Sequence, residues 1–117
     1  MSYSVYLPDS FKRSLKRLTR RFPRVRQDVS AAIEEILRVP SLGIVIPGSG
    51  GVRKLRVRST DLERGKSGGF RLLYIVLPDR ELICPLLIYA KSDWEDVTRR
   101  ELRALLADLK RELALMA

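Results

Sequence analysis

The sequence predicts an α+β fold: a small antiparallel sheet packed by helices, in the element order β-α-α-β-β-β-α. Three runs with strand-like alternation or continuous apolar character lie between residues 53 and 90, separated by short turns or a glycine-rich loop. Apolar residues recur at helical spacing before these runs and after them. The 117 residues suit one domain, so we expect residues 1–117 to form a single unit.

The first part of the chain predicts a short strand followed by a helical hairpin. Residues 3–7 alternate in the manner of a strand, and Pro8-Asp9 ends it, with Asp9 placed to cap the next helix. Pro23 separates two helical stripes. The stripes consist of Phe11, Leu15, Leu18 and Phe22, and of Val25, Val29, Ala32, Ile33, Ile36 and Leu37.

A glycine-rich stretch, residues 41–51, reads as a long, mobile connection to the sheet. The strands that follow are expected at 53–58, 70–77 and 82–90, as an antiparallel meander with the helices on one face. Pro85 lies inside the last of these strands and has no N–H to donate. We therefore expect an edge position or a β-bulge there.

The last helix has a clear beginning, because Thr98 and Glu101 form the pattern of a capping box. Leucines from 102 to 113 form its apolar stripe, which could pack on the sheet or remain partly exposed for a partner. The acids at 93, 95 and 96 precede this helix, and we interpret them as compensating its dipole.

Composition narrows the possible functions. The net charge of +9 and pI of about 10.3 favour a polyanionic partner, with nucleic acid ranked above a membrane surface. A basic surface kept for solubility is the alternative. No apolar run reaches the roughly 18 residues of a membrane span, and the N-terminus lacks a signal-peptide pattern, so we expect a cytoplasmic location.

Catalytic chemistry is limited by the absence of histidine and by a single cysteine, Cys84. This excludes serine–histidine and cysteine–histidine catalysis and histidine-ligated zinc. The acidic residues show no spacing typical of a magnesium nuclease, and we expect neither a metal nor a cofactor. Arginine, lysine and tyrosine remain, and these can support metal-free RNA cleavage, in which the ribose 2′-OH attacks the adjacent phosphate.

The expected strands place several of these residues together. Lys54, Arg56 and Arg58 share one strand face, and Arg71 begins the neighbouring strand after a loop that carries Arg64 and Lys66. Tyr89 and Lys91 are expected on one face at the end of the last strand. Arginine suits the charge that develops on phosphorus, lysine a proton transfer, and tyrosine a proton transfer or base stacking. The alternative is that these are solvent-facing surface cations.

The first helix carries a basic face without chemistry of its own, which we expect to contact RNA or the ribosome. Arg58 and Arg64 could extend this electrostatic contact. The basic residues of the helix face are Lys12, Arg13, Lys16, Arg17 and Arg20.

The run G-V-R-K-L-R-V-R, then G-K-S-G-G-F-R-L-L-Y, then L-L-I-Y-A-K resembles the RelE/ParE superfamily of type II toxin–antitoxin modules, in its RelE/HigB-like branch. The resemblance covers residues 50–106 by motif and the whole chain by element order. It implies a ribosome-dependent, metal-independent endoribonuclease that cuts mRNA, and a cognate antitoxin that binds the toxin in a hetero-oligomer. Carried over by position, it implies catalytic roles for Lys54, Arg56, Lys66, Arg71, Tyr89 and Lys91.

The chain departs from the family pattern in one place. Some RelE members have an arginine just after the lysine that matches Lys91 and a tyrosine further on, where Ser92 and Thr98 stand here. This leaves the general base unassigned. Two other functions stay open: a ParE-like toxin that poisons gyrase, and a non-catalytic RNA or ribosome binder. Loss of activity on removing Arg71, Lys54 or Lys66 would distinguish the nuclease from both.

Overall fold

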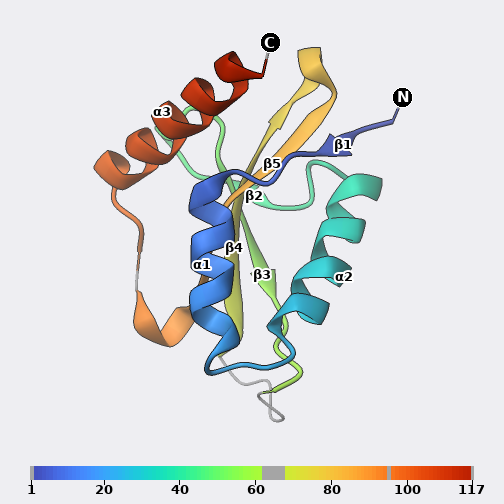
Figure 1. Ribbon diagram of the computed structural model, residues 1–117, viewed down its shortest axis with the longest axis vertical. Helices are drawn as coiled ribbons and strands as arrows, with labels where there is room; N and C mark the ends of the chain where they lie inside the picture. The colour runs from blue at the N-terminus through green and yellow to red at the C-terminus, as the bar shows by residue number, and fades with distance from the viewer. Residues whose placement is uncertain (1, 62–67, 95, 117) are drawn as a thin grey trace.

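The computed structural model describes residues 2–61, 68–94 and 96–116 (Figure 1). Within them the chain is an α+β fold with a five-stranded sheet in the order β1-β5-β4-β3-β2 and three α-helices. The strands are β1 (Ser4–Val5), β2 (Ile44–Val45), β3 (Arg53–Val57), β4 (Phe70–Leu77) and β5 (Leu82–Ala90). The helices are α1 (Asp9–Thr19), α2 (Val25–Arg38) and α3 (Arg99–Leu115), with short 3-10 turns η1 (Pro78–Arg80) and η2 (Lys91–Asp93).

The sheet is mixed, whereas the sequence predicted an antiparallel one. The meander β3-β4-β5 is antiparallel as expected, but β1 pairs in parallel with β5. The predicted loop 41–51 also contains a strand, because Ile44 pairs with Lys54 and Val45 with Arg53. The glycines of this stretch suggested a loop. Ile44, Val45 and Ile46 nevertheless form a β-branched run, which favours a strand at the sheet edge.

The helices lie on both faces of the sheet, and the expectation of one face was wrong. Leu72 and Tyr74 of β4 belong to the apolar cluster of α1 and α2, whereas Leu73 and Ile75 belong to the cluster of α3. Successive side chains of a strand point to opposite faces, and β4 is apolar in both directions. Its two faces therefore both require a helical layer, and Figure 1 shows α3 apart from the α1–α2 pair.

Pro85 lies at a β-bulge of β5. The bulge is confirmed, and β1 pairs only with Leu82 and Ile83, so Pro85 lies beyond the part of β5 that has a strand on both sides. Leu73 pairs with Leu87 and Tyr74 pairs with Pro85, which leaves Leu86 as the extra residue. The bulge places the proline, which cannot donate a hydrogen bond, where the regular ladder is already interrupted.

Two serines of α1 bond to the backbone of β5 beside this bulge. The hydroxyl of Ser10 donates to the Leu86 carbonyl at 2.9 Å, and the Ile88 N–H donates to Ser14 Oγ at 3.1 Å. Both serines are buried, one helical turn apart on the same side of α1. They join α1 to the sheet by satisfying polar backbone groups that would otherwise be buried without a partner.

Tyr74 fixes the beginning of the connection between α2 and β3. Its fully buried hydroxyl donates to the Pro40 carbonyl at 2.8 Å and accepts from the Gly43 N–H at 2.7 Å. A Cβ on Gly43 would lie 2.9 Å from the Tyr74 ring, so only glycine fits without a shift. The start of the stretch expected to be a mobile loop is thus held by the core.

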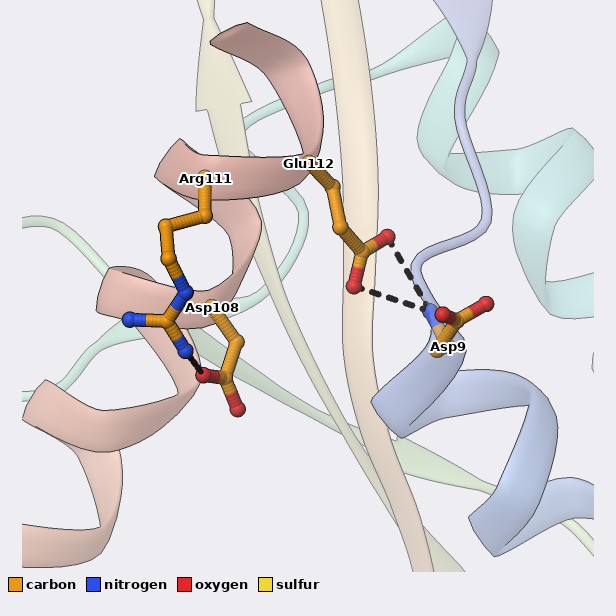
Figure 2. Close-up of polar contacts among 4 residues, drawn as sticks. All are labelled: Asp9, Asp108, Arg111 and Glu112. Atoms are coloured by element: carbon orange, nitrogen blue, oxygen red, sulfur yellow. Dashed lines mark hydrogen bonds and ion pairs between the residues drawn. The ribbon is translucent and has the colours of Figure 1, made fainter. Parts of the chain in front are cut away.

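α1 begins one residue earlier than predicted, with Pro8 at the N-cap and Asp9 as its first residue, and Pro8 offers no side-chain cap. Glu112 of α3, which is far away in the sequence, caps the helix instead. Its carboxylate accepts from the Asp9 N–H at 3.3 and 3.4 Å (Figure 2). A negative charge suits the positive end of a helix dipole. The last turns of α3 are thereby joined to the start of α1.

The capping box of α3 is confirmed. The Thr98 N–H donates to Glu101 Oε1 at 2.8 Å, and the Glu101 N–H donates to Thr98 Oγ1 at 3.1 Å. Leu102, Leu109 and Leu113 are buried against the sheet, so most of the predicted leucine stripe packs inward. Within the described residues, no helix is long and apolar enough to cross a membrane.

Candidate nucleic-acid interface

Three polar side chains form a row across the sheet. Arg71 on the central strand β4 pairs with Arg56 of β3 on one side and with Tyr89 of β5 on the other. Residues paired in this way point to the same face. That face is the α3 face, because Tyr89 belongs to the α3 cluster. We call Arg56, Arg71 and Tyr89 the cation row.

Arg71 is buried, with 9 % of its surface exposed. Its Nη1 donates to the Phe70 carbonyl at 3.2 Å, and no carboxylate within the described ranges forms an ion pair with it. Burial, followed by the charge of Arg56, lowers the pKa of Arg71, while Tyr89 acts in the opposite direction. Arginine nevertheless stays protonated in proteins. A permanent cation is therefore held in an apolar setting opposite a second cation, which costs stability.

Tyr89 is also buried, with 5 % exposed, and its ring lies 5.4 Å from the ring of Trp94 at an angle of 57°. Burial is the main cause that raises its pKa, the carboxylate of Asp96 raises it further, and Arg71 lowers it. At neutral pH Tyr89 is consequently a neutral phenol that can donate a proton.

Lys54 lies two residues before Arg56 on β3 and so faces the same way. Its ammonium group is 3.5 Å from the carboxylate of Asp96. It also lines a pocket of about 490 Å³ between β2 and the start of α3. The structure thus brings Lys54 to the cation row, as the strand pattern predicted.

Other predicted residues lie beyond the row. β5 ends at Ala90, so Lys91 starts the turn η2 and does not continue the strand alternation with Tyr89 as expected. Its N–H donates to the Gly69 carbonyl at 3.1 Å, which keeps Lys91 at the end of the sheet where β4 begins. Arg58 is exposed after the end of β3. The predicted loop residues Arg64 and Lys66 lie outside the described residues.

The basic face of α1 is exposed, as predicted, but it does not join the cation row. α1 packs on the sheet face that carries Leu72 and Tyr74, which is opposite to that of Arg71. The exposed residues of this face are Lys12, Arg13, Lys16, Arg17 and Arg20.

Sequence reasoning missed two residues beside the site. Arg21, just after α1, has its guanidinium 2.6 Å from the carboxylate of Asp93 in η2. Trp94 packs on Tyr89. The available signal was the one tryptophan of the chain, set among acids directly after the last strand. Asp93 and Asp96, interpreted as dipole compensation, are engaged in ion pairs with Arg21 and Lys54.

The fold is that of a known class of bacterial toxins. A double arginine mutant of the Escherichia coli toxin RelE, in the free state, is similar over 81 % of this chain and 90 % of its own, with a TM-score of 0.58 and 21 % sequence identity. The RelBE2 toxin–antitoxin complex from Mycobacterium tuberculosis is similar over 75 % of this chain and 96 % of the matched chain, with a TM-score of 0.52 and 20 % identity. No protein-family model matches the sequence. The chain therefore has the RelE fold, as its sequence motifs predicted.

Proposed function

We propose that this protein is the toxin of a type II toxin–antitoxin system and that it is a metal-independent endoribonuclease acting on mRNA at the ribosome. The observation that carries the proposal is the buried Arg71 between Arg56 and Tyr89, which forms no ion pair with any of the described residues. Packing alone would favour an apolar residue at this position. The similarity of the fold to RelE and to the RelBE2 complex supports the same reading.

The chemistry that suits these groups is a transesterification at phosphorus within the RNA chain. The ribose 2′ oxygen forms a bond to the adjacent phosphorus, and the bond from phosphorus to the 5′ oxygen breaks. The products are a 2′,3′-cyclic phosphate and a free 5′-OH. The proton of the 2′-OH must be accepted, and a proton must reach the departing oxygen.

Arg71 is proposed to bind the phosphate oxygens while negative charge builds on them. Its guanidinium can donate two parallel hydrogen bonds, and the neighbouring strands hold it in place before substrate arrives. The buried setting strengthens each of these interactions relative to water. Removing such a donor typically lowers the rate by about 10² to 10³.

Tyr89 is proposed to donate the proton to the departing 5′ oxygen, because its raised pKa keeps the phenol protonated. Lys54 and Arg56 would orient the scissile phosphate and neutralise its charge. Lys66 and Lys91 are proposed to contribute further cations, and no residue is assigned as the general base. RNA would extend to Arg58, which is exposed, and to Arg64.

Two partners follow from this proposal. An antitoxin would bind the toxin in a hetero-oligomer, and the similar RelBE2 structure is a complex of this kind. The ribosome would offer ribosomal RNA to the basic face of α1, whose charges suit a phosphate backbone.

The proposal is tested by inducible expression in a bacterial host, with the wild type compared with Arg71→Ala. Transcript 5′ ends are mapped with and without a block of translation. We expect new ends inside translated codons with the wild type alone, and none when translation is blocked. Growth arrest with DNA breaks and without new RNA ends would instead identify a gyrase poison. A fully toxic Arg71→Ala variant would overturn the site.

A further inference from the structure

Two carboxylates from the connection between β5 and α3 form ion pairs with cations near the cation row. Asp93 lies 2.6 Å from Arg21, and Asp96 lies 3.5 Å from Lys54. Trp94 follows Asp93 directly in the sequence and packs against the buried ring of Tyr89. The chain thus places an anion, an aromatic ring and a second anion beside the proposed site.

Arg21 lies at the same end of the sheet as Arg71. Its guanidinium carbon is 5.0 Å from the centre of the Phe22 ring, and that ring meets Phe70 edge-on at 5.1 Å between centres. Phe70 immediately precedes Arg71 and pairs with Ala90, the residue before η2. Arg21 is therefore near the row, although it belongs to the segment that follows α1 on the other face of the sheet.

We propose that Arg21 and Lys54 are two phosphate-binding positions for single-stranded RNA, and that Asp93 and Asp96 hold them in the free protein in place of phosphates. This rests on the proposed function for the class of ligand. Trp94 lies between the two paired carboxylates in the sequence, and a short single strand has similar chemistry, because its phosphates flank a base that stacks on an aromatic side chain.

The two ion pairs are suited to exchange. The side chains of Arg21 and Asp93 are 52 % and 42 % exposed, and those of Lys54 and Asp96 are 38 % and 82 % exposed. Exposed pairs of this kind contribute little stability and weaken with salt. An RNA phosphodiester has two unesterified oxygens that accept hydrogen bonds as a carboxylate does, and its binding also releases counterions from RNA. RNA can therefore displace both carboxylates at small cost.

Exchange would also expose Tyr89. Its ring is shielded by Trp94, and the Asp96 carboxylate helps to raise the pKa of Tyr89. When Asp93 and Asp96 release their cations, the ion pairs that hold the chain on both sides of Trp94 are broken. Binding of phosphate and access to the proposed proton donor are thereby coupled.

The first test uses the free protein, since Trp94 is the one tryptophan of the chain and reports on this place alone. Acrylamide quenching of its fluorescence is measured in the wild type, in Asp93→Asn/Asp96→Asn, and in Asp79→Asn/Asp108→Asn as a control with the same change of net charge. Asp79 lies in η1 and Asp108 on α3 pairs with Arg111 (Figure 2), so neither contacts the site. We expect quenching to be higher in the first double variant at low salt, and to rise with salt in the wild type and control only. Equal quenching in all three proteins would overturn the proposal.

The second test measures binding of a short single-stranded RNA with 2′-O-methyl riboses, which cannot be cleaved by 2′ attack. We expect Asp93→Asn/Asp96→Asn to bind several-fold more tightly than the equally charged control, and Arg21→Met to weaken binding several-fold. Binding to the wild type should increase the quenching of Trp94. No binding at low salt, or equal affinities of the two double variants, would overturn the proposal.

These measurements do not depend on cleavage, so they separate the two proposals. Exchange of the carboxylates in a protein that cuts no RNA would leave the binding site standing and remove the nuclease. Cleavage of RNA without any change in the quenching of Trp94 would support the nuclease and remove the proposed exchange of carboxylates.

Discussion

The hydroxyl of Tyr6 donates a 2.7 Å hydrogen bond to the carboxylate of Glu112, which also accepts from the N–H of Asp9. One side chain of α3 thus joins the segment after β1 and the first turn of α1, although more than a hundred residues separate them in the chain. Since α3 is the one helix on its face of the sheet within the described residues, this contact helps to fix its position.

This bond predicts a stability loss at alkaline pH. The hydrogen bond to Glu112, followed by burial and the charge of Glu112, raises the pKa of Tyr6 from 10.0 to about 12. A raised pKa in the folded state means that the contribution is complete below pH 10.0 and is lost toward pH 12. The difference in free energy of unfolding between wild type and Tyr6→Phe should therefore shrink above pH 10.0.

Urea unfolding of both proteins on either side of that pH measures the difference directly. Glu112→Gln serves as the second variant, because without the carboxylate the pKa of Tyr6 should return toward its ordinary value. Curves for wild type and Tyr6→Phe that stay parallel across the whole range would contradict the bond.

The cation row predicts that stability and activity respond in opposite ways. Arg71→Met removes a buried cation opposite Arg56 and supplies an unbranched apolar side chain. We expect the free energy of unfolding to stay the same or rise by roughly 1 kcal/mol. Activity should fall by about 10²-fold or more, because a preorganised phosphate donor is lost.

Thermal or urea unfolding is compared with toxicity and RNA cleavage in the same preparations. Arg80→Met, in the turn η1, is the matched control and should keep both stability and activity. A variant at Arg71 that unfolds several kcal/mol more easily would show that this residue serves the fold instead.

Local patterns in the sequence predicted most elements, because the information for them lies within a few residues. The helical stripes that include Phe11 and Val25, the meander β3-β4-β5 and the capping box at Thr98 all belong to this kind. Arg56 and Arg71 could be placed on one face from strand alternation alone, once the two strands were neighbours.

Contacts between distant segments could not be predicted in this way. The parallel pairing of Ser4 with Leu82 depends on where α1 and α2 return the chain, and the position of α3 depends on which sheet face remains free. Arg21 was one more cation after a basic helix, and only the fold shows that it meets Asp93. Polar residues that are brought together only by tertiary structure have no regular spacing in the sequence from which their contact could be predicted.

Ser14 illustrates such a hidden contact and gives a stability prediction. Its hydroxyl accepts from the Ile88 N–H beside the bulge and donates to the Phe11 carbonyl at 2.9 Å. Ser14→Ala leaves the buried N–H of Ile88 without a partner, which should cost roughly 1–3 kcal/mol. Thr19→Ala is the control, since Thr19 donates to the Lys16 carbonyl in the same local pattern without reaching the sheet. If urea unfolding shows equal losses for both variants, the bond to β5 contributes nothing.

Tyr74 gives the sharpest test of how the sheet edge is built. Tyr74→Phe keeps the ring in the core but removes the hydroxyl that bonds to both Pro40 and Gly43. The Gly43 N–H then loses its buried acceptor, so the free energy of unfolding should fall by roughly 1–3 kcal/mol. Hydrogen exchange of the Gly43 amide should accelerate more than that of the central strands, because the connection opens locally before the fold does. Tyr3→Phe, at the margin of the same core, is the control. Unchanged exchange at Gly43 would mean that pairing of β2 with β3, and not Tyr74, holds this edge of the sheet.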